Sequence, residues 1–242
     1  MSALAHRPRV LGGLMRLLTA LAVLAVPVFC VTTSVRVAVN SLPLYTYGFH
    51  RYKVAETTGI APQELEGVAR AFIAYFNGPE EWLTVRARVF GAERSLFNQR
   101  EVLHMRDVKG LVRGVYRAQE VAGGVLALWL AVGLWAQGRA FVGRVLLLAG
   151  GLSIGLLVVA AVALAVAFPW LFTLFHLLSF RNPFWQLDPS RDLLIRLFPE
   201  GFWFMATMLV AGASLAQAGI AMLVGWGLLV WGRRPTGAGG GR

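Results

Sequence analysis

The sequence of 242 residues is short of cysteine, histidine and acidic residues. Its single cysteine, Cys30, excludes an internal disulfide. It contains no G-x-S-x-G motif and no H-x-x-x-H or H-E-x-x-H spacing, so neither a serine-hydrolase elbow nor a zinc-protease helix is indicated. Only 12 acidic residues stand against 23 basic ones, which gives a net charge of +11. The remaining question is where these charges lie.

Charge is absent from four long stretches, residues 17–35, 121–138, 145–180 and 201–232. The chain is 57% hydrophobic, more than the roughly 45–50% of a soluble domain. Because a membrane span needs about 20 mainly apolar residues, these runs predict four transmembrane helices. We expect an all-α membrane protein with transmembrane helices at 15–36, 119–138, 145–168 and 203–231.

The basic residues predict the topology. Eight of the 23 lie in the first 16 residues, the 139–144 loop and the C-terminal tail, and none of the 12 acids does. The positive-inside rule therefore places the N-terminal segment 1–14, the 139–144 loop and the 232–242 tail in the cytoplasm, with both termini inside. The first helix is expected to be retained, because no A-x-A site follows it and Phe29 before Cys30 does not fit a lipobox. Without a soluble basic domain, the charge does not indicate nucleic-acid binding.

Two segments, 37–118 and 169–202, are then extracellular. The first is long enough to fold as a helical cap. Its residues 61–78 have apolar positions at helical spacing, and a second helix is expected from Asn98, a plausible N-cap with Glu101 at the matching position, through residue 117. The second segment is rich in aromatic residues. Gly151 and Gly155 form a small-xxx-small pair that predicts helix packing.

Two histidines fall near the predicted outer membrane surface, His104 in "EVLHMRDVKG" and His176 in the aromatic segment. Helical phasing places His104 on an apolar face, with Asp107 near its edge and Lys109 toward lipid headgroups or solvent. Ionisable groups at membrane depth are costly and suggest function. Three interpretations remain open: structural histidines with satisfied hydrogen bonds, acid–base catalysis, or a metal site of His104, Asp107 and His176.

Two long patterns carry a resemblance to a known family. The "HM-x-DVK" core at 104–109 and the "FH…F…W…DP…D-L-I…FP…F" pattern at 175–202, in a four-helix membrane protein of this length, resemble the lipoprotein intramolecular transacylases. These bacterial integral membrane proteins were formerly an uncharacterised family. The resemblance implies four transmembrane helices under an extracellular cap, in the bacterial cytoplasmic membrane, with the active site on the extracellular face.

The resemblance also implies an activity. Such enzymes move the sn-2 acyl chain of a diacylglyceryl lipoprotein onto the α-amino group of its N-terminal cysteine, which gives a lyso-form lipoprotein. His104 and His176 are implied as catalytic, no cofactor is needed, and the partners are the lipoprotein substrate and membrane lipids. We expect His104 to be the base, because Asp107 or Glu101 is near it in sequence.

Four further residues are supporting substrate-site candidates: Tyr47, Asp107, Trp185 and Asp192. Tyr47 could equally be an interfacial anchor, and Asp192 could cap a short helix or pair with an arginine. Two alternatives to the transacylase remain, a metal-dependent membrane lipid hydrolase and a non-enzymatic membrane scaffold.

Overall fold

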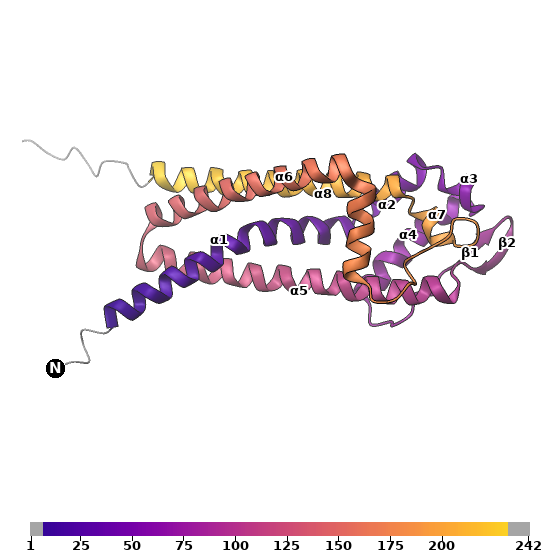
Figure 1. Ribbon diagram of the computed structural model, residues 1–242, viewed down its shortest axis with the longest axis horizontal. Helices are drawn as coiled ribbons and strands as arrows, with labels where there is room; N and C mark the ends of the chain where they lie inside the picture. Colours follow the sequence, from indigo (N-terminus) through magenta and orange to yellow (C-terminus); the bar gives the residue numbers. More distant parts are fainter. Residues whose placement is uncertain (1–6, 232–242) are drawn as a thin grey trace, which may run out of the picture. The chain divides into compact units, whose positions relative to one another are not determined.

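The structure, a computed structural model, describes residues 7–231; residues 1–6 and the tail 232–242 lie outside the described residues. Four long helices dominate it: α1 (Arg7–Val39), α5 (Gln99–Ala136), α6 (Arg139–Ser179) and α8 (Glu200–Trp231) (Figure 1). Each contains a stretch long and apolar enough to cross a membrane. The prediction of a mainly helical membrane protein is thereby confirmed in its helical content and in its four candidate spans.

Shorter elements connect the long helices: α2 (Leu42–Arg51), α3 (Val54–Thr58), α4 (Pro62–Asn77), β1 (Arg86–Val89), β2 (Ala92–Ser95) and α7 (Leu193–Leu197). The chain divides into two compact units, each described here by itself. Among the described residues, unit 1 consists of 7–33, 118–160 and 212–231, and unit 2 of 34–117 and 161–211. All four long helices contribute residues to both units.

In unit 1, glycines allow α6 and α8 to approach closely. A Cβ on Gly143 would lie 2.6 Å from the carbonyl oxygen of Gly225, and a Cβ on Gly225 would lie 2.8 Å from that of Gly143. Gly150 likewise has no room for a side chain, because Met222 Cγ would lie 2.5 Å from its Cβ. The predicted pair Gly151 and Gly155 meets nothing within 4 Å. That prediction was wrong, because the small-residue spacing recurs along α6 and does not reveal which face the neighbouring helix covers.

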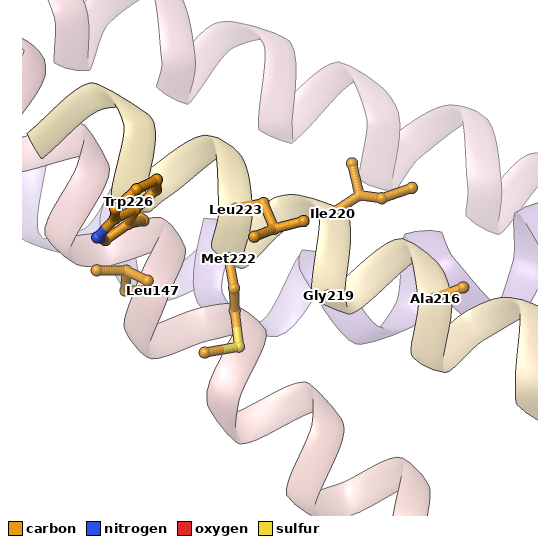
Figure 2. Close-up of a pocket in the computed structure, with 7 residues that line it drawn as sticks. All are labelled: Leu147, Ala216, Gly219, Ile220, Met222, Leu223 and Trp226. Carbon is orange, nitrogen blue, oxygen red and sulfur yellow. The ribbon is translucent and has the colours of Figure 1, made fainter. Parts of the chain in front are cut away.

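A shallow apolar groove lies on the same pair of helices (Figure 2). It is lined by Leu147 of α6 and by Ala216, Gly219, Ile220, Met222, Leu223 and Trp226 of α8. Its lining offers hydrocarbon almost exclusively, with no titratable side chain. The groove therefore suits apolar chains and provides no catalytic chemistry.

Unit 2 has a core rich in aromatic residues. The rings of Phe72 and Phe198 lie 5.0 Å apart edge to face, and Phe49 lies 5.5 Å from Phe198. Helix α4 supplies Phe72 from its buried face, which follows the apolar spacing predicted for residues 61–78. That helix is confirmed. The core thus joins α2, α4 and the start of α8 around one aromatic cluster.

A β-hairpin in unit 2 was not predicted. Strands β1 and β2 pair antiparallel, and Val89 is opposite Ala92 across the turn. Phe90 and Gly91 both have positive φ values, 50° and 85°, as a two-residue hairpin turn requires. The alternation of buried Ala87 and Val89 with exposed arginines, followed by Phe-Gly, is the local signal that could have indicated it.

The start of α5 is capped as the sequence predicted. The backbone N–H of Asn98 donates to Glu101 Oε2 at 2.8 Å, and the N–H of Glu101 donates to Asn98 Oδ1 at 3.1 Å. This reciprocal pair satisfies two amides that a helix start leaves without partners. Helix α5 then continues without interruption to Ala136, so no break separates the predicted cap helix from the predicted second span.

Helix α6 bends at Ala167, whose φ of −126° and ψ of 34° are not helical. Pro169 follows two residues later. Proline removes a backbone donor and crowds the preceding turn, so it is the physical reason for the bend. The last turns of α6, drawn in orange, consequently take a different direction from the turns just before the bend (Figure 1). These last turns carry His176.

Candidate active site

The two histidines singled out from the sequence come together in unit 2. His104 lies in the second turn of α5, and His176 lies one turn before the end of α6. Their ring centroids are 6.2 Å apart with an interplanar angle of 31°. His104 is buried, with 7% of its surface exposed, whereas His176 is half-buried. Two imidazoles at this separation can both reach one small reacting group.

Aromatic side chains surround the pair, and we call Phe172, Phe175, Phe180 and Trp185 the aromatic wall. Phe180 lies against both imidazoles, at centroid distances of 5.0 Å from His104 and 5.5 Å from His176. The other three rings contact His176 at 4.4 Å (Phe172), 5.4 Å (Phe175) and 5.1 Å (Trp185). An apolar surrounding of this kind strengthens polar interactions at the imidazoles and keeps water away from them.

A backbone contact determines the tautomer of His176. Its Nδ1 lies 2.7 Å from the carbonyl oxygen of Phe172, one turn earlier in α6. Because a carbonyl oxygen can only accept, Nδ1 must carry the proton. In a neutral imidazole the lone pair is then on Nε2. His176 is therefore oriented and prepared to accept a proton at Nε2.

His104 differs from His176 in this respect. Among the described residues, its buried Nδ1 has no hydrogen-bond partner. A buried polar atom without a partner is unusual and costly in a folded protein. A polar group that enters the site beside the imidazole could provide the missing partner.

Among the described contacts, neither nearby carboxylate forms a hydrogen bond with His104. Glu101 accepts from the backbone N–H groups of Asn98 at 2.8 Å and of Leu194 at 2.7 Å, and it is almost fully buried. Asp107 accepts from Asn182 Nδ2 at 2.8 Å. The expectation that one of them orients His104 therefore has no hydrogen bond to support it, since Glu101 binds the backbone of Asn98 and Leu194 and Asp107 binds Asn182.

Two of these three partners belong to the segment that follows α6. Asn182 and Leu194 lie in it, and Arg100 of α5 donates from Nη2 to the carbonyl oxygens of Pro183 and Gln186, both at 2.7 Å. The first turns of α5 thus hold the segment that brings Phe180 and Trp185 to the histidines. Sequence reasoning missed Arg100 and Asn182; the Asn-Pro pair is a turn signal that could have drawn attention to Asn182.

The other four predicted site residues differ in how close they lie to the histidines. Trp185 contacts His176 as described, and Asp107 supports the same segment through Asn182. Asp192 is buried and accepts from Asn98 Nδ2 at 2.8 Å and from the N–H of Asp188 at 2.7 Å, with no side-chain cap on α7. Tyr47 is 58% exposed and makes no ring contact with either histidine in the described part of the chain.

Two further charged residues have defined surroundings. Asp188 accepts from the N–H and Oγ of Ser190 at 2.9 and 2.8 Å, and these bonds lower the pKa of its carboxyl. Lys109 was expected to face headgroups or solvent, which is wrong. It is buried, with Nζ donating to the carbonyl oxygens of Gly78 at 2.9 Å and Glu80 at 2.6 Å. Helical phasing missed this because the 78–83 loop covers that side of α5.

The proposed metal-ligand set does not assemble. Within the described range 7–231, no group of three His, Cys, Asp or Glu side chains is arranged to hold a metal ion. Asp107 is engaged with Asn182, and it makes no hydrogen bond to His104 among the described contacts. In the described part of the chain the two histidines therefore lie together without a third side chain of a metal-ligand type beside them.

Comparison with known proteins gives two findings. Residues 20–203, which include both histidines, match the model of one family, described as lipoprotein intramolecular transacylase Lit. The fold is similar to an in meso structure of the membrane integral lipoprotein intramolecular transacylase Lit from Bacillus cereus, with a TM-score of 0.79, 18% sequence identity, and coverage of 92% of this chain and 99% of that chain.

Two further structures of the same Bacillus cereus protein are also similar, and in each a histidine is replaced. The arginine variant has a TM-score of 0.76 at 17% identity and covers 95% of this chain and 98% of that chain. The alanine variant has a TM-score of 0.75 at 17% identity and covers 94% and 99%. At these identities the likeness concerns the fold. No curated protein matches the sequence.

Proposed function

The chain belongs to the lipoprotein intramolecular transacylases, a family of acyltransferases that act on lipoproteins, and from this premise we propose its reaction and its catalytic residues. The enzyme transfers the sn-2 acyl chain of a diacylglyceryl lipoprotein to the α-amino group of the lipoprotein's N-terminal cysteine. His104 and His176 catalyse this transfer by acid–base chemistry. The observation that carries the proposal is the histidine pair, 6.2 Å apart within the aromatic wall.

The chemistry requires two proton-transfer groups and no nucleophile of the enzyme. The donor ester and the acceptor amine belong to one molecule, so the amine nitrogen can attack the ester carbonyl directly. A C–N bond forms, the C–O bond to glycerol breaks, and the proton lost by the amine ends on the glyceryl oxygen. A site that holds amine and ester in a reactive pose lowers the barrier through orientation alone.

The two histidines have different roles in this proposal. His176 is the base, because its Nδ1–H bond to Phe172 leaves Nε2 to accept the amine proton. His104, whose buried Nδ1 has no partner among the described residues, donates a hydrogen bond to the oxyanion of the tetrahedral intermediate, or protonates the departing glyceryl oxygen while the imidazolium of His176 returns the amine proton to His104. This assignment reverses the one expected from the sequence.

The aromatic wall prevents the competing reaction. Water at the site would hydrolyse the ester and release a free fatty acid. Phe180 contacts both imidazoles, and with the other rings of the aromatic wall, which contact His176, it leaves little room for water beside the reacting carbonyl. Trp185 closes the side of His176, and Asp107, with Asn182, holds the segment that carries it. Asp192 acts as a positioning residue for the same segment.

The proposal includes a location. Both chain ends face the cytoplasm, residues 37–118 form an extracellular cap, and the site faces the outer surface of the bacterial cytoplasmic membrane. The distribution of arginines in the sequence supports this orientation. The diacylglyceryl substrate is anchored in the same membrane, so it reaches the histidines by lateral diffusion. Tyr47, exposed on α2, is proposed to contact it at the interface.

The decisive experiment is tandem mass spectrometry of a lipoprotein's N-terminal peptide from bacteria that express this chain. Substrate and product are isomers of equal mass, so fragmentation must locate the acyl chain. An acyl group on the amine supports the proposal. Loss of one acyl group would instead indicate a lipid hydrolase, and a chelator that abolishes the activity would make it metal-dependent. An unchanged peptide would indicate a non-enzymatic scaffold.

A further inference from the structure

Helix α6 is longer than a membrane span requires. Its 41 residues would extend about 60 Å at the helical rise per residue, roughly twice the hydrocarbon thickness of a bilayer. The bend at Ala167 separates the last turns, residues 168–179, from the rest of the helix. This terminal segment contains no charged residue, although it lies beyond a stretch already long enough to span.

The terminal segment has one face turned toward the protein. Phe168 lies 5.3 Å from Phe204 of α8, and Phe172 lies 6.2 Å from Trp203, as ring-centroid distances. His176 continues this face toward His104. These contacts account for the aromatic residues at 168, 172 and 176.

The opposite face is apolar and exposed. Trp170, Leu177 and Leu178 all have large exposed areas, and Leu178 is 79% exposed. Together with Leu174 they follow the i, i+4, i+7, i+8 spacing of one helical stripe. A contiguous exposed apolar stripe of this kind marks an interaction surface.

The one polar side chain on this stripe is satisfied internally. Thr173 Oγ1 donates to the carbonyl oxygen of Pro169 at 2.9 Å. This bond satisfies the hydroxyl without water, as burial in hydrocarbon requires. Helix α4 provides the contrast within unit 2, because its exposed face carries the ion pair Arg70–Glu66 at 2.6 Å, as a face in water does.

We infer that the exposed face of residues 168–179 is embedded in the bilayer, against the acyl chains of neighbouring lipids. The segment continues the span of α6 without an intervening charge, so its apolar stripe extends the lipid-facing surface of that span. It enters the bilayer after the bend, as a helix that lies in the membrane and does not cross it. The embedded segment holds His176 at a defined depth.

That depth has a consequence which rests on the proposed function. His176 directly precedes Leu177 and Leu178, and Leu178 is the most exposed residue of the stripe. The imidazole is thereby held at the level of the glyceryl esters of membrane lipids. A lipid-anchored substrate can then present its ester to His176 without leaving the bilayer, and the enzyme need not extract its acyl chains into water.

Spin-label depth measurements test the inference without an activity assay. In a Cys30→Ala background, a nitroxide is attached at Leu178→Cys, with Phe90→Cys at the exposed hairpin tip as the water control and Leu223→Cys of α8 as the hydrocarbon control. In phospholipid vesicles, oxygen reports hydrocarbon and a nickel chelate reports water. The oxygen-to-nickel collision ratio at 178 should match that at 223 and exceed that at 90 several-fold. A ratio equal to that at 90 overturns the inference.

A second variant tests the depth of His176. Leu178→Lys should slow acyl transfer several-fold, since an ammonium draws this end of the segment toward water, whereas Leu178→Ala should retain most activity. An unchanged rate in the lysine variant overturns the consequence for His176. The two proposals fail separately. If the label at 178 lies in hydrocarbon but the protein has no transacylase activity, only the proposed function is contradicted. If the label lies in water and the enzyme is active, only this inference is contradicted.

Discussion

The imidazole Nδ1 of His176 and the carbonyl oxygen of Phe172 lie 2.7 Å apart, one turn from each other on the same helix. This single contact distinguishes the two histidines of the site. It fixes the ring of His176 and directs its basic nitrogen outward, while His104 keeps a buried Nδ1 without a partner among the described residues. The first prediction follows from this asymmetry.

His176→Asn should abolish acyl transfer and leave the fold intact. The asparagine amide can still donate to the Phe172 carbonyl, as Nδ1 does, but it cannot accept a proton at the position of Nε2. We expect a loss of about 10²-fold or more, as for removal of a general base. His104→Asn should reduce acyl transfer by a similar factor. The transfer is measured by fragmentation of the lipoprotein peptide, and full activity in either variant would remove that histidine from the mechanism.

Glu101→Gln should lower stability and activity together. The buried carboxylate accepts two backbone N–H groups, those of Asn98 and Leu194. A glutamine turns an NH₂ donor toward one of them, which costs about 1–3 kcal/mol. Thermal unfolding in detergent should show a lower Tm. The matched control is Glu66→Gln, whose exposed pairing with Arg70 should contribute little.

Asp107 and Asn182 should act as a unit. Their hydrogen bond, 2.8 Å long, joins α5 to the segment that carries Trp185. Asp107→Ala and Asn182→Ala should each reduce kcat, and the double variant should be no worse than the poorer single one, with a coupling of about 0.5–3 kcal/mol. Arg181→Ala, at an exposed neighbouring position, is the control. Additive losses would contradict a shared role.

Lys109→Met should destabilise unit 2. Lys109 donates to the carbonyl oxygens of Gly78 and Glu80, and its ammonium lies 4.3 Å from the ring centroid of Tyr75. Loss of two hydrogen bonds from a charged donor costs about 1.5–3 kcal/mol each. Lys53→Met should stay within about 0.5 kcal/mol, because Lys53 is exposed. Limited proteolysis of the 78–83 loop provides the readout, and equal cleavage in both variants would refute the prediction.

Gly225→Ala should loosen the packing of α6 on α8 in unit 1. The new Cβ would lie 2.8 Å from the Gly143 carbonyl oxygen, so the helices must separate. We expect a loss of about 1–3 kcal/mol, typical of overpacking. Gly151→Ala meets nothing within 4 Å and should be neutral or stabilising by up to about 1 kcal/mol through helix propensity. A lower Tm for Gly225→Ala than for Gly151→Ala would support the observed contact face between α6 and α8, and equal Tm values would contradict it.

The features that the sequence determined by itself are those set within one element. Uncharged apolar runs determined the four candidate spans, because burial of backbone in lipid needs long apolar helices. Apolar spacing determined α4, and the Asn98–Glu101 pair determined where α5 begins. The motifs around His104 and His176 indicated the family, which the match over residues 20–203 confirmed.

Only the tertiary structure decided which partners the charged and polar side chains take. Glu101 binds Leu194, Asp107 binds Asn182, and Lys109 binds the loop after α4, all far apart in sequence. Helical phasing shows the face on which a residue lies, but not what covers that face. The approach of His176 to His104, with ring centroids 6.2 Å apart, depended on the packing of the last turns of α6, after the bend at Ala167, beside α5. These choices follow from packing between distant segments, on which local patterns carry no information.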